Sequence, residues 1–156
     1  MEANPRAARL QATEDMSISL FDMMDSLSTA LDLINPALDD HHKLTCYVAC
    51  CIAEEMGYDD TAYNELFAAS ILHDIGAIAL AERMKLLEFE DRNPHLHGKL
   101  GAILLSKFPP FQDFAPLVKF HHVPWRDGEG KTFKEQVVPM GSHLIHLADR
   151  IAVLVN

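Results

Sequence analysis

The stretch "LFAASILHDIG", residues 66–76, decides how the rest of this sequence is interpreted. Apolar and small side chains fill most of it, and His73 and Asp74 stand together among them. Burying an imidazole beside a carboxylate costs free energy unless a partner compensates both groups. The stretch therefore predicts a buried helix whose polar pair needs such a partner.

The composition indicates one globular domain. The chain has 156 residues, 49% of them hydrophobic, which is enough for a sizeable core. Its formal net charge of −10 argues against a broad basic face for extended nucleic acid. A small phosphorylated ligand remains compatible with this charge if metal ions supply positive charge. We expect a polar lead-in over residues 1–13 and the domain over residues 14–156.

The cysteines and the absence of sorting signals indicate a cytoplasmic protein without membrane insertion. Cys46, Cys50 and Cys51 fall in one short segment, so no disulfide framework is indicated. Cys46 and Cys50 are spaced like half of a zinc site, but burial as small core residues is the favoured interpretation. The N-terminus lacks the pattern of a signal peptide. No run of about 20 apolar residues would span a bilayer.

The spacing of apolar residues predicts an all-α bundle of about six to seven helices. Helices are expected over residues 18–34, 40–56, 59–76, from Asn93 to about residue 105, over 114–122, and from Ser142 to the end of the sequence. Residues 123–136 are expected to form a loop, and no segment predicts paired strands. The last helix is still apolar where the sequence stops, which suggests a trimmed domain, a homodimer, or a fusion to regulatory domains.

Nine histidines are many for a chain of this length. A single histidine in an apolar helix is most often a hydrogen-bonded core or surface residue. Here, however, His-His and His-Asp doublets occur on several expected helices. Imidazole and carboxylate suit first-row transition metals, and one carboxylate can bridge two ions. Adjacent histidines on a helix point about 100° apart, so they meet one ion only near a helix end or approach a two-metal site from one side.

Taken in order, these motifs resemble those of the HD superfamily of metal-dependent phosphohydrolases, and most closely its HD-GYP branch. The motifs are "HH" (41–42), "HDIG" (73–76), "HGKLG" (97–101), "HH" (121–122) and "ADR" (148–150). The resemblance covers about residues 37–156 and implies the helical bundle of the HD domain.

The resemblance also implies a dinuclear site for two divalent transition metal ions, such as Fe, Mn, Zn or Ni. The implied ligands are His41, His73 and Asp149 for one ion and His97, His121 and His122 for the other, with Asp74 as the bridge. Asp74 and His73 would thus form the catalytic centre. The nucleophile would be a metal-bound hydroxide, which suits in-line attack on phosphorus.

Three departures from the HD-GYP pattern concern the substrate more than the metals. HD-GYP proteins usually carry a lysine directly after HDIG that helps to position the phosphate, and this chain has Ala77. Some members carry a glutamate for a third metal where this chain has Ala37. The loop "HHVPWRDGEGKTF" (121–133) has Lys131 and Thr132 in place of the tyrosine and proline of the GYP motif. The dinuclear site is therefore better supported than a cyclic di-GMP substrate.

Several further residues are candidates for substrate contacts. They are Lys43, Lys119, Trp125, Arg126 and Arg150, and for each the alternative is a solvated charge or a packing residue. Four histidines match no ligand position and are expected to be ordinary hydrogen-bonded residues: His42, His95, His143 and His146. His95 has the alternative of supporting a ligand through a hydrogen bond.

The leading hypothesis is a phosphodiesterase acting on a cyclic dinucleotide or another nucleotide phosphate ester. The first alternative is a non-catalytic signalling module that binds a nucleotide or a partner protein, which the missing lysine and the altered loop favour. The second is a structural helical bundle with incidental histidines, which leaves the ordered doublets unexplained.

Overall fold

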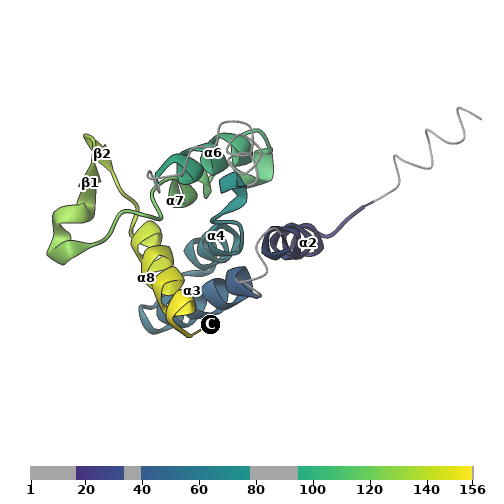
Figure 1. Cartoon of the computed structure of the whole chain (residues 1–156), viewed down its shortest axis with the longest axis horizontal. Helices are drawn as coiled ribbons and strands as arrows, with labels where there is room; N and C mark the ends of the chain where they lie inside the picture. The colour runs from purple at the N-terminus through teal and green to yellow at the C-terminus, as the bar shows by residue number, and fades with distance from the viewer. Residues whose placement is uncertain (1–16, 34–39, 78–94, 156) are drawn as a thin grey trace, which may run out of the picture.

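The computed structural model describes residues 17–33, 40–77 and 95–155. The expected polar lead-in (1–13), Ala37 and the helix start at Asn93 lie outside these residues. Within the described part the chain is mostly helical, which confirms the predicted all-α bundle (Figure 1).

The described elements begin with α2 (Leu20–Asp32), α3 (His41–Glu55), α4 (Asp60–Ile71) and α6 (His95–Leu105). They continue with η2 (Pro109–Phe111), α7 (Ala115–Lys119), η3 (Arg126–Lys131), β1 (Thr132–Phe133), β2 (Gln136–Val137) and α8 (Met140–Val155). Asp59 caps α4, because its side chain accepts a hydrogen bond from the Ala62 N–H at 2.9 Å. No described helix has the length and apolar character needed to cross a membrane.

Helix α4 lies in the middle of the bundle. Figure 1 shows α6 and α7 on one side of it and α3 on the other, with α8 packed along α3. Helix α2 lies against α3 and α4. The α4 position explains why the stretch 66–76 is so apolar, since helices surround it on several sides.

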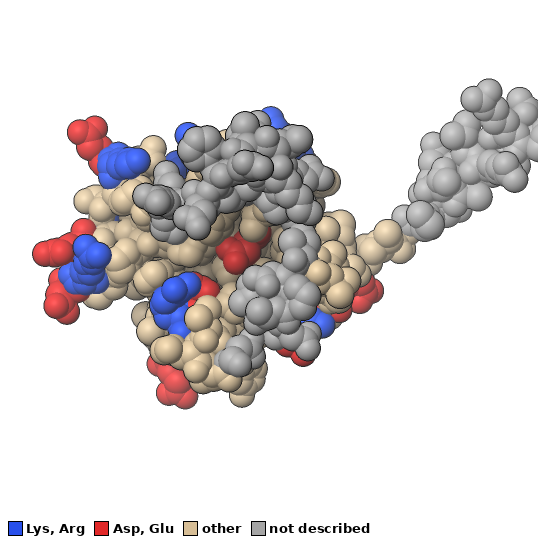
Figure 2. Space-filling model, in the orientation of Figure 1, with Lys and Arg blue, Asp and Glu red and all other residues tan. Residues whose placement is uncertain are grey.

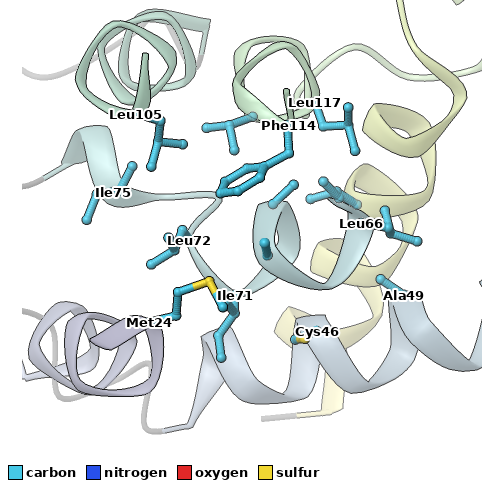
Figure 3. Close-up of a cluster of buried hydrophobic side chains, with 14 of the residues drawn as sticks. Met24, Cys46, Ala49, Leu66, Ile71, Leu72, Ile75, Leu105, Phe114 and Leu117 are labelled. Atoms are coloured by element: carbon cyan, nitrogen blue, oxygen red, sulfur yellow. The ribbon is translucent and has the colours of Figure 1, made fainter. Parts of the chain in front are cut away.

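The hydrophobic core fills the space around α4. Figure 3 shows the Phe114 ring pointing toward Leu72, Ile75 and Leu105, and all four side chains are buried. Burial of one such side chain stabilises the fold by roughly 1.5–3 kcal/mol. Cys46, at 4% exposure, also belongs to this core, in line with the favoured interpretation of the cysteines.

Two helices end earlier than the sequence predicts. In both cases a candidate site residue lies in the turn that follows the helix. The predicted helix 59–76 ends at Ile71, and His73 Nδ1 lies 2.8 Å from the carbonyl oxygen of Ser70. The predicted helix 114–122 ends at Lys119, and His121 Nδ1 lies 2.6 Å from the carbonyl oxygen of Val118. In each case an imidazole N–H satisfies a carbonyl at the helix terminus, so the backbone can leave the helix there.

The predicted loop 123–136 contains more structure than expected. Strands β1 and β2 form a two-stranded antiparallel hairpin, in which Thr132 pairs with Val137 and Phe133 with Gln136. The expectation of no paired strands is therefore wrong at this position. Lys134 and Glu135 form the turn with positive φ angles of 48° and 65°, a conformation that such tight hairpin turns require.

Candidate metal centre

The first cluster of potential metal ligands joins three separate segments. It consists of His41 at the first turn of α3, His73 in the turn after α4, and Asp149 on α8. All three side chains are buried, and His41 Nε2 lies 3.2 Å from Asp149 Oδ1. The packing of α8 along α3 places this histidine and this carboxylate side by side.

His73 is a buried, neutral imidazole with one unsatisfied nitrogen. Its Nδ1–H donates to Ser70 O at 2.8 Å, so Nε2 carries the lone pair. Nε2 is buried and makes no hydrogen bond in the described structure. Complete burial lowers the pKa of His73 to about 4, against the weaker opposing effect of Asp74. An unprotonated, buried and unsatisfied nitrogen of this kind fits a metal ion.

Asp149 and His41 each shift the pKa of the other group toward its charged form. A hydrogen bond to Asp149 raises the pKa of His41. Burial opposes ionisation of Asp149, but His41, His73 and Arg150 hold its pKa well below the usual range. Arg150 donates to Asp149 Oδ2 at 2.6 Å, which leaves Oδ1 directed at His41.

The second cluster consists of Asp74, His97, His121 and His122. His97 Nε2 lies 3.2 Å from His121 Nε2 and 2.7 Å from His122 Nε2. Metal–nitrogen bonds of about 2.0–2.1 Å place neighbouring ligand atoms roughly 3 Å apart. The three imidazoles are thus spaced as ligands of one ion would be.

Hydrogen bonding and burial also favour neutral imidazoles in this cluster. Nδ1–H of His121 donates to Val118 O at 2.6 Å, so its Nε2 lone pair points to the other rings. Burial, together with His121 and His97, lowers the pKa of His122 to about 3. A cation between these nitrogens would satisfy lone pairs that otherwise face one another.

Asp74 links the two clusters. Its Oδ2 lies 3.5 Å from His73 Nε2, and its Oδ1 lies 3.0 Å from His97 Nε2. Burial opposes ionisation of Asp74, but the adjacent His73 and the imidazoles of His121 and His97 hold its pKa well below the usual range. One carboxylate therefore faces both potential ion positions.

The structure adds His42, a residue for which the sequence predicts no ligand role. The side chain is buried, its Nδ1 is hydrogen-bonded to Asp32 Oδ1, and its Nε2 has no hydrogen-bond partner. Potential ligand atoms of His42, His73 and Asp74 lie within 4.8 Å of one another. The doublet at a helix start is the sequence signal that points to it, since adjacent histidines converge there.

Two of the predicted substrate residues line a mostly apolar pocket of about 570 Å³. They are Trp125 and Arg150, and the other lining residues include His143, His146 and Leu147. The Trp125 ring packs edge-on against His143 with centroids 5.2 Å apart.

A second pocket, of about 370 Å³, is basic. Lys119 lines it together with His95, Lys99 and Lys134, and Lys119 Nζ is 2.8 Å from Gln136 Oε1. The His122 ring is near a lining residue of each pocket, with its centroid 6.5 Å from that of His95 and 6.4 Å from that of His146. The second ligand cluster is therefore close to residues of a basic pocket and of an apolar one.

The remaining two substrate candidates are placed differently. Arg126 lines a smaller pocket near the hairpin, whereas Lys43 is half-exposed and pairs with Asp25 at 3.2 Å. On the face shown in Figure 2, basic side chains are scattered among acidic and uncharged ones.

Comparison with known proteins identifies the family. Residues 38–154 match the family described as HD domain. This match covers most of the chain, so the protein belongs to the HD domain family, the phosphohydrolase superfamily that its motifs resemble. No solved structure matches the chain.

Two curated relatives are phosphodiesterases of cyclic dinucleotides. The 3'3'-cGAMP-specific phosphodiesterase 1 of Vibrio cholerae is 27% identical over 141 residues, which cover 90% of this chain and 32% of that protein. The cyclic di-GMP phosphodiesterase of Thermotoga maritima is 27% identical over 146 residues, covering 88% of this chain and 39% of that protein. The chain thus spans about a third of the length of these relatives.

Proposed function

We propose that this protein is a metal-dependent phosphodiesterase acting on a cyclic dinucleotide or a similar nucleotide phosphate ester. The observation that carries the proposal is the meeting of two ligand clusters, one buried and one partly buried, at one carboxylate, Asp74. The activities named for the two relatives support the choice of substrate class.

In this proposal each cluster holds one divalent transition metal ion. His41, His73 and Asp149 bind the first, His97, His121 and His122 bind the second, and Asp74 bridges them. When bound, the ions would supply a hydroxide near neutral pH and stabilise charge on the phosphoryl oxygens. The ligand set is compatible with Fe, Mn, Zn or Ni.

The surrounding protein fixes the ligands in a productive state. The carbonyl groups of Ser70 and Val118 hold the Nδ1 protons of His73 and His121, so both rings present Nε2 to the centre. Arg150 holds Asp149. Such hydrogen bonds orient ligands and strengthen metal binding.

The two pockets beside His122 suit the two parts of a nucleotide. The apolar pocket offers Trp125 as a surface on which a base would stack. The basic pocket brings together Lys99, Lys119 and Lys134, which would attract phosphate groups. In this arrangement the scissile phosphate would lie between the pockets, next to the metal ligands.

Metal analysis and hydrolysis assays test the proposal. Protein prepared anaerobically with Fe²⁺ or Mn²⁺ should retain transition metal and hydrolyse cyclic di-GMP, 3'3'-cGAMP or bis(p-nitrophenyl) phosphate. Asp74→Asn should abolish hydrolysis, whereas the exposed-site variant Asp113→Asn should not affect it. Wild-type protein that binds less than about one equivalent of metal would contradict the proposal, because the family chemistry depends on bound ions.

A second candidate is a binding module without catalysis. Ala77, where HD-GYP proteins usually carry the phosphate-positioning lysine, favours it. Calorimetry separates the two candidates: a metal-loaded protein that binds a cyclic dinucleotide and never cleaves it would be a sensor of that ligand.

A further inference from the structure

We infer that His42 is an additional metal ligand of this centre and that Asp32 of α2 holds it in the ligating state. The inference rests on the proposed dinuclear centre and adds to it a residue outside the ligand set that the family resemblance implies. His42 would bind the ion that His73 and Asp74 hold.

The position of His42 in the fold makes ligation possible. His41 and His42 are the first two residues of α3, following Asp40, whose backbone has a positive φ of 55°. Both imidazoles are buried, at 2% and 3% exposure, so the second histidine does not turn out to solvent. The ring centroid of His42 lies 5.1 Å from that of His73.

The hydrogen bond to Asp32 fixes the tautomer of His42. A carboxylate only accepts hydrogen bonds, so the proton of the neutral ring resides on Nδ1 and the lone pair on Nε2. Metal-bound histidines typically donate their other ring N–H to a carboxylate or a carbonyl, as here. Asp32 is itself buried, at 8% exposure, which keeps water from competing for the bond.

The lone pair on His42 Nε2 has no hydrogen-bond partner although it is fully buried. An unsatisfied buried polar atom costs about 1–3 kcal/mol, so its retention calls for a function. One potential ligand atom each of His42, His73 and Asp74 lies within 4.8 Å of the other two. Because His73 Nδ1 is already used by Ser70 O, His73 has one nitrogen to offer, and His42 would share its ion.

With Asp32, the proposed metal site would include a residue outside the stretch that matches the HD domain. Residue 32 lies outside the matched stretch 38–154, on a helix that packs against α3 and α4. Through Asp32, α2 would contribute to metal affinity without itself providing a ligand.

Three variants of the full chain test the inference. His42→Gln removes the imidazole, Asp32→Asn removes the carboxylate with little change in shape, and Asp25→Asn is the control at a partly exposed aspartate of the same helix. Binding of Co²⁺ is followed by visible absorption in competition with a chelator. We expect His42→Gln and Asp32→Asn to weaken the affinity for one ion about 10–100-fold and the control to leave it unchanged.

A measurement on the wild-type protein does not depend on any variant folding. In long-range ¹H–¹⁵N spectra of histidine-labelled protein, Zn²⁺ should shift the His42 Nε2 resonance together with those of the other proposed ligands. A His42 Nε2 that is unshifted or protonated with Zn²⁺ bound would overturn the inference, as would native-like His42→Gln protein with wild-type Co²⁺ affinity and spectrum.

These outcomes separate the inference from the proposed function. Wild-type protein that binds two ions and hydrolyses the substrate, with His42 unaffected, refutes the ligand role of His42 alone. Wild-type protein that binds no transition metal refutes both.

Discussion

His97 on α6 and His122 beyond α7 bring their Nε2 atoms to within 2.7 Å, although 25 residues separate them in the sequence. If this contact belongs to a metal site, removal of one ring should abolish binding of the metal ion and not merely break a hydrogen bond. His97→Asn should therefore lose about one equivalent of bound metal and reduce hydrolysis at least about 100-fold. Metal content and turnover of the same preparation check this expectation.

Leu104→Ala is the matched control, because Leu104 lies on the same helix and is 43% exposed. It should keep both metal content and activity. Equal activity of the His97→Asn and Leu104→Ala proteins would show that the second cluster plays no part in the reaction.

Ala77 provides a gain-of-function prediction. It directly follows the HDIG motif, where HD-GYP proteins usually place a phosphate-positioning lysine. A charge-assisted hydrogen bond contributes about 1.5–3 kcal/mol, so Ala77→Lys should raise kcat/KM for cyclic di-GMP about 10–100-fold. Steady-state kinetics provides the measurement, with Ala77→Gln as the uncharged control of similar length. An equal effect of lysine and glutamine would argue against a phosphate contact.

The buried histidines predict how acid affects the metal-free protein. Folding lowers the pKa of His73 from 6.5 to about 4 and that of His122 to about 3. Below pH 6.5 the unfolded chain therefore binds more protons than the folded one, and the free energy of unfolding falls as the pH decreases. For His73 the slope is at most about 1.4 kcal/mol per pH unit, down to about pH 4.

Urea denaturation of chelator-treated protein between about pH 4.5 and 7.5 measures this slope, because this range covers the upper part of the window that the two shifts open below pH 6.5. His73→Asn should flatten the profile. His41 acts in the opposite sense, because its pKa is raised by Asp149, but its stabilising contribution is lost only above pH 6.5. A profile that is flat for the wild type below pH 6.5 would contradict the assignment of a neutral, buried His73.

Gly76 predicts a link between backbone packing and the metal site. A Cβ at Gly76 would lie 2.0 Å from the carbonyl oxygen of His97 and 2.4 Å from the amide nitrogen of Gly101, both on α6. Gly76→Ala must therefore push α6 away, at a cost of about 1–3 kcal/mol or more. It should also weaken metal binding by the second cluster, because His97 moves with its helix.

Gly141→Ala offers a comparison within the same core. There the new Cβ would meet the side-chain end of Leu117 at 2.8 Å rather than a backbone atom. Thermal unfolding and metal titration should show a smaller loss for Gly141→Ala in both quantities. The reverse order would mean that α6 is not fixed by its contact with Gly76.

Much of the fold was predictable because the helices are amphipathic and because capping or terminating residues mark several of their ends. Asp59 caps α4 and Gly57, with φ 71°, ends the preceding turn, as the sequence indicates. The early end of α4 at Ile71 was not predictable, because residues 60–75 contain no glycine or proline. At this end the side chain of His73 donates a hydrogen bond to the Ser70 carbonyl oxygen. The position of His73 depends on tertiary packing, which the sequence alone does not show.

The hairpin and the buried contact between His42 and Asp32 were missed for related physical reasons. The turn at Lys134 and Glu135 has none of the glycine or asparagine that usually marks a positive-φ hairpin turn. His42 depends on Asp32, a residue on another helix, and the sequence alone does not show that the two meet. The ligand order along the chain was predictable because short motifs carry it; which residues bind metal remains a prediction.

The contact between His41 and Asp149 joins the beginning and the end of the HD domain. An ion bound there would cross-link the two ends of the domain. It would bind the folded state far better than the unfolded chain. The lifetime of the folded protein would then follow the supply of metal. In a cell short of that metal, the folded protein would be less stable against unfolding.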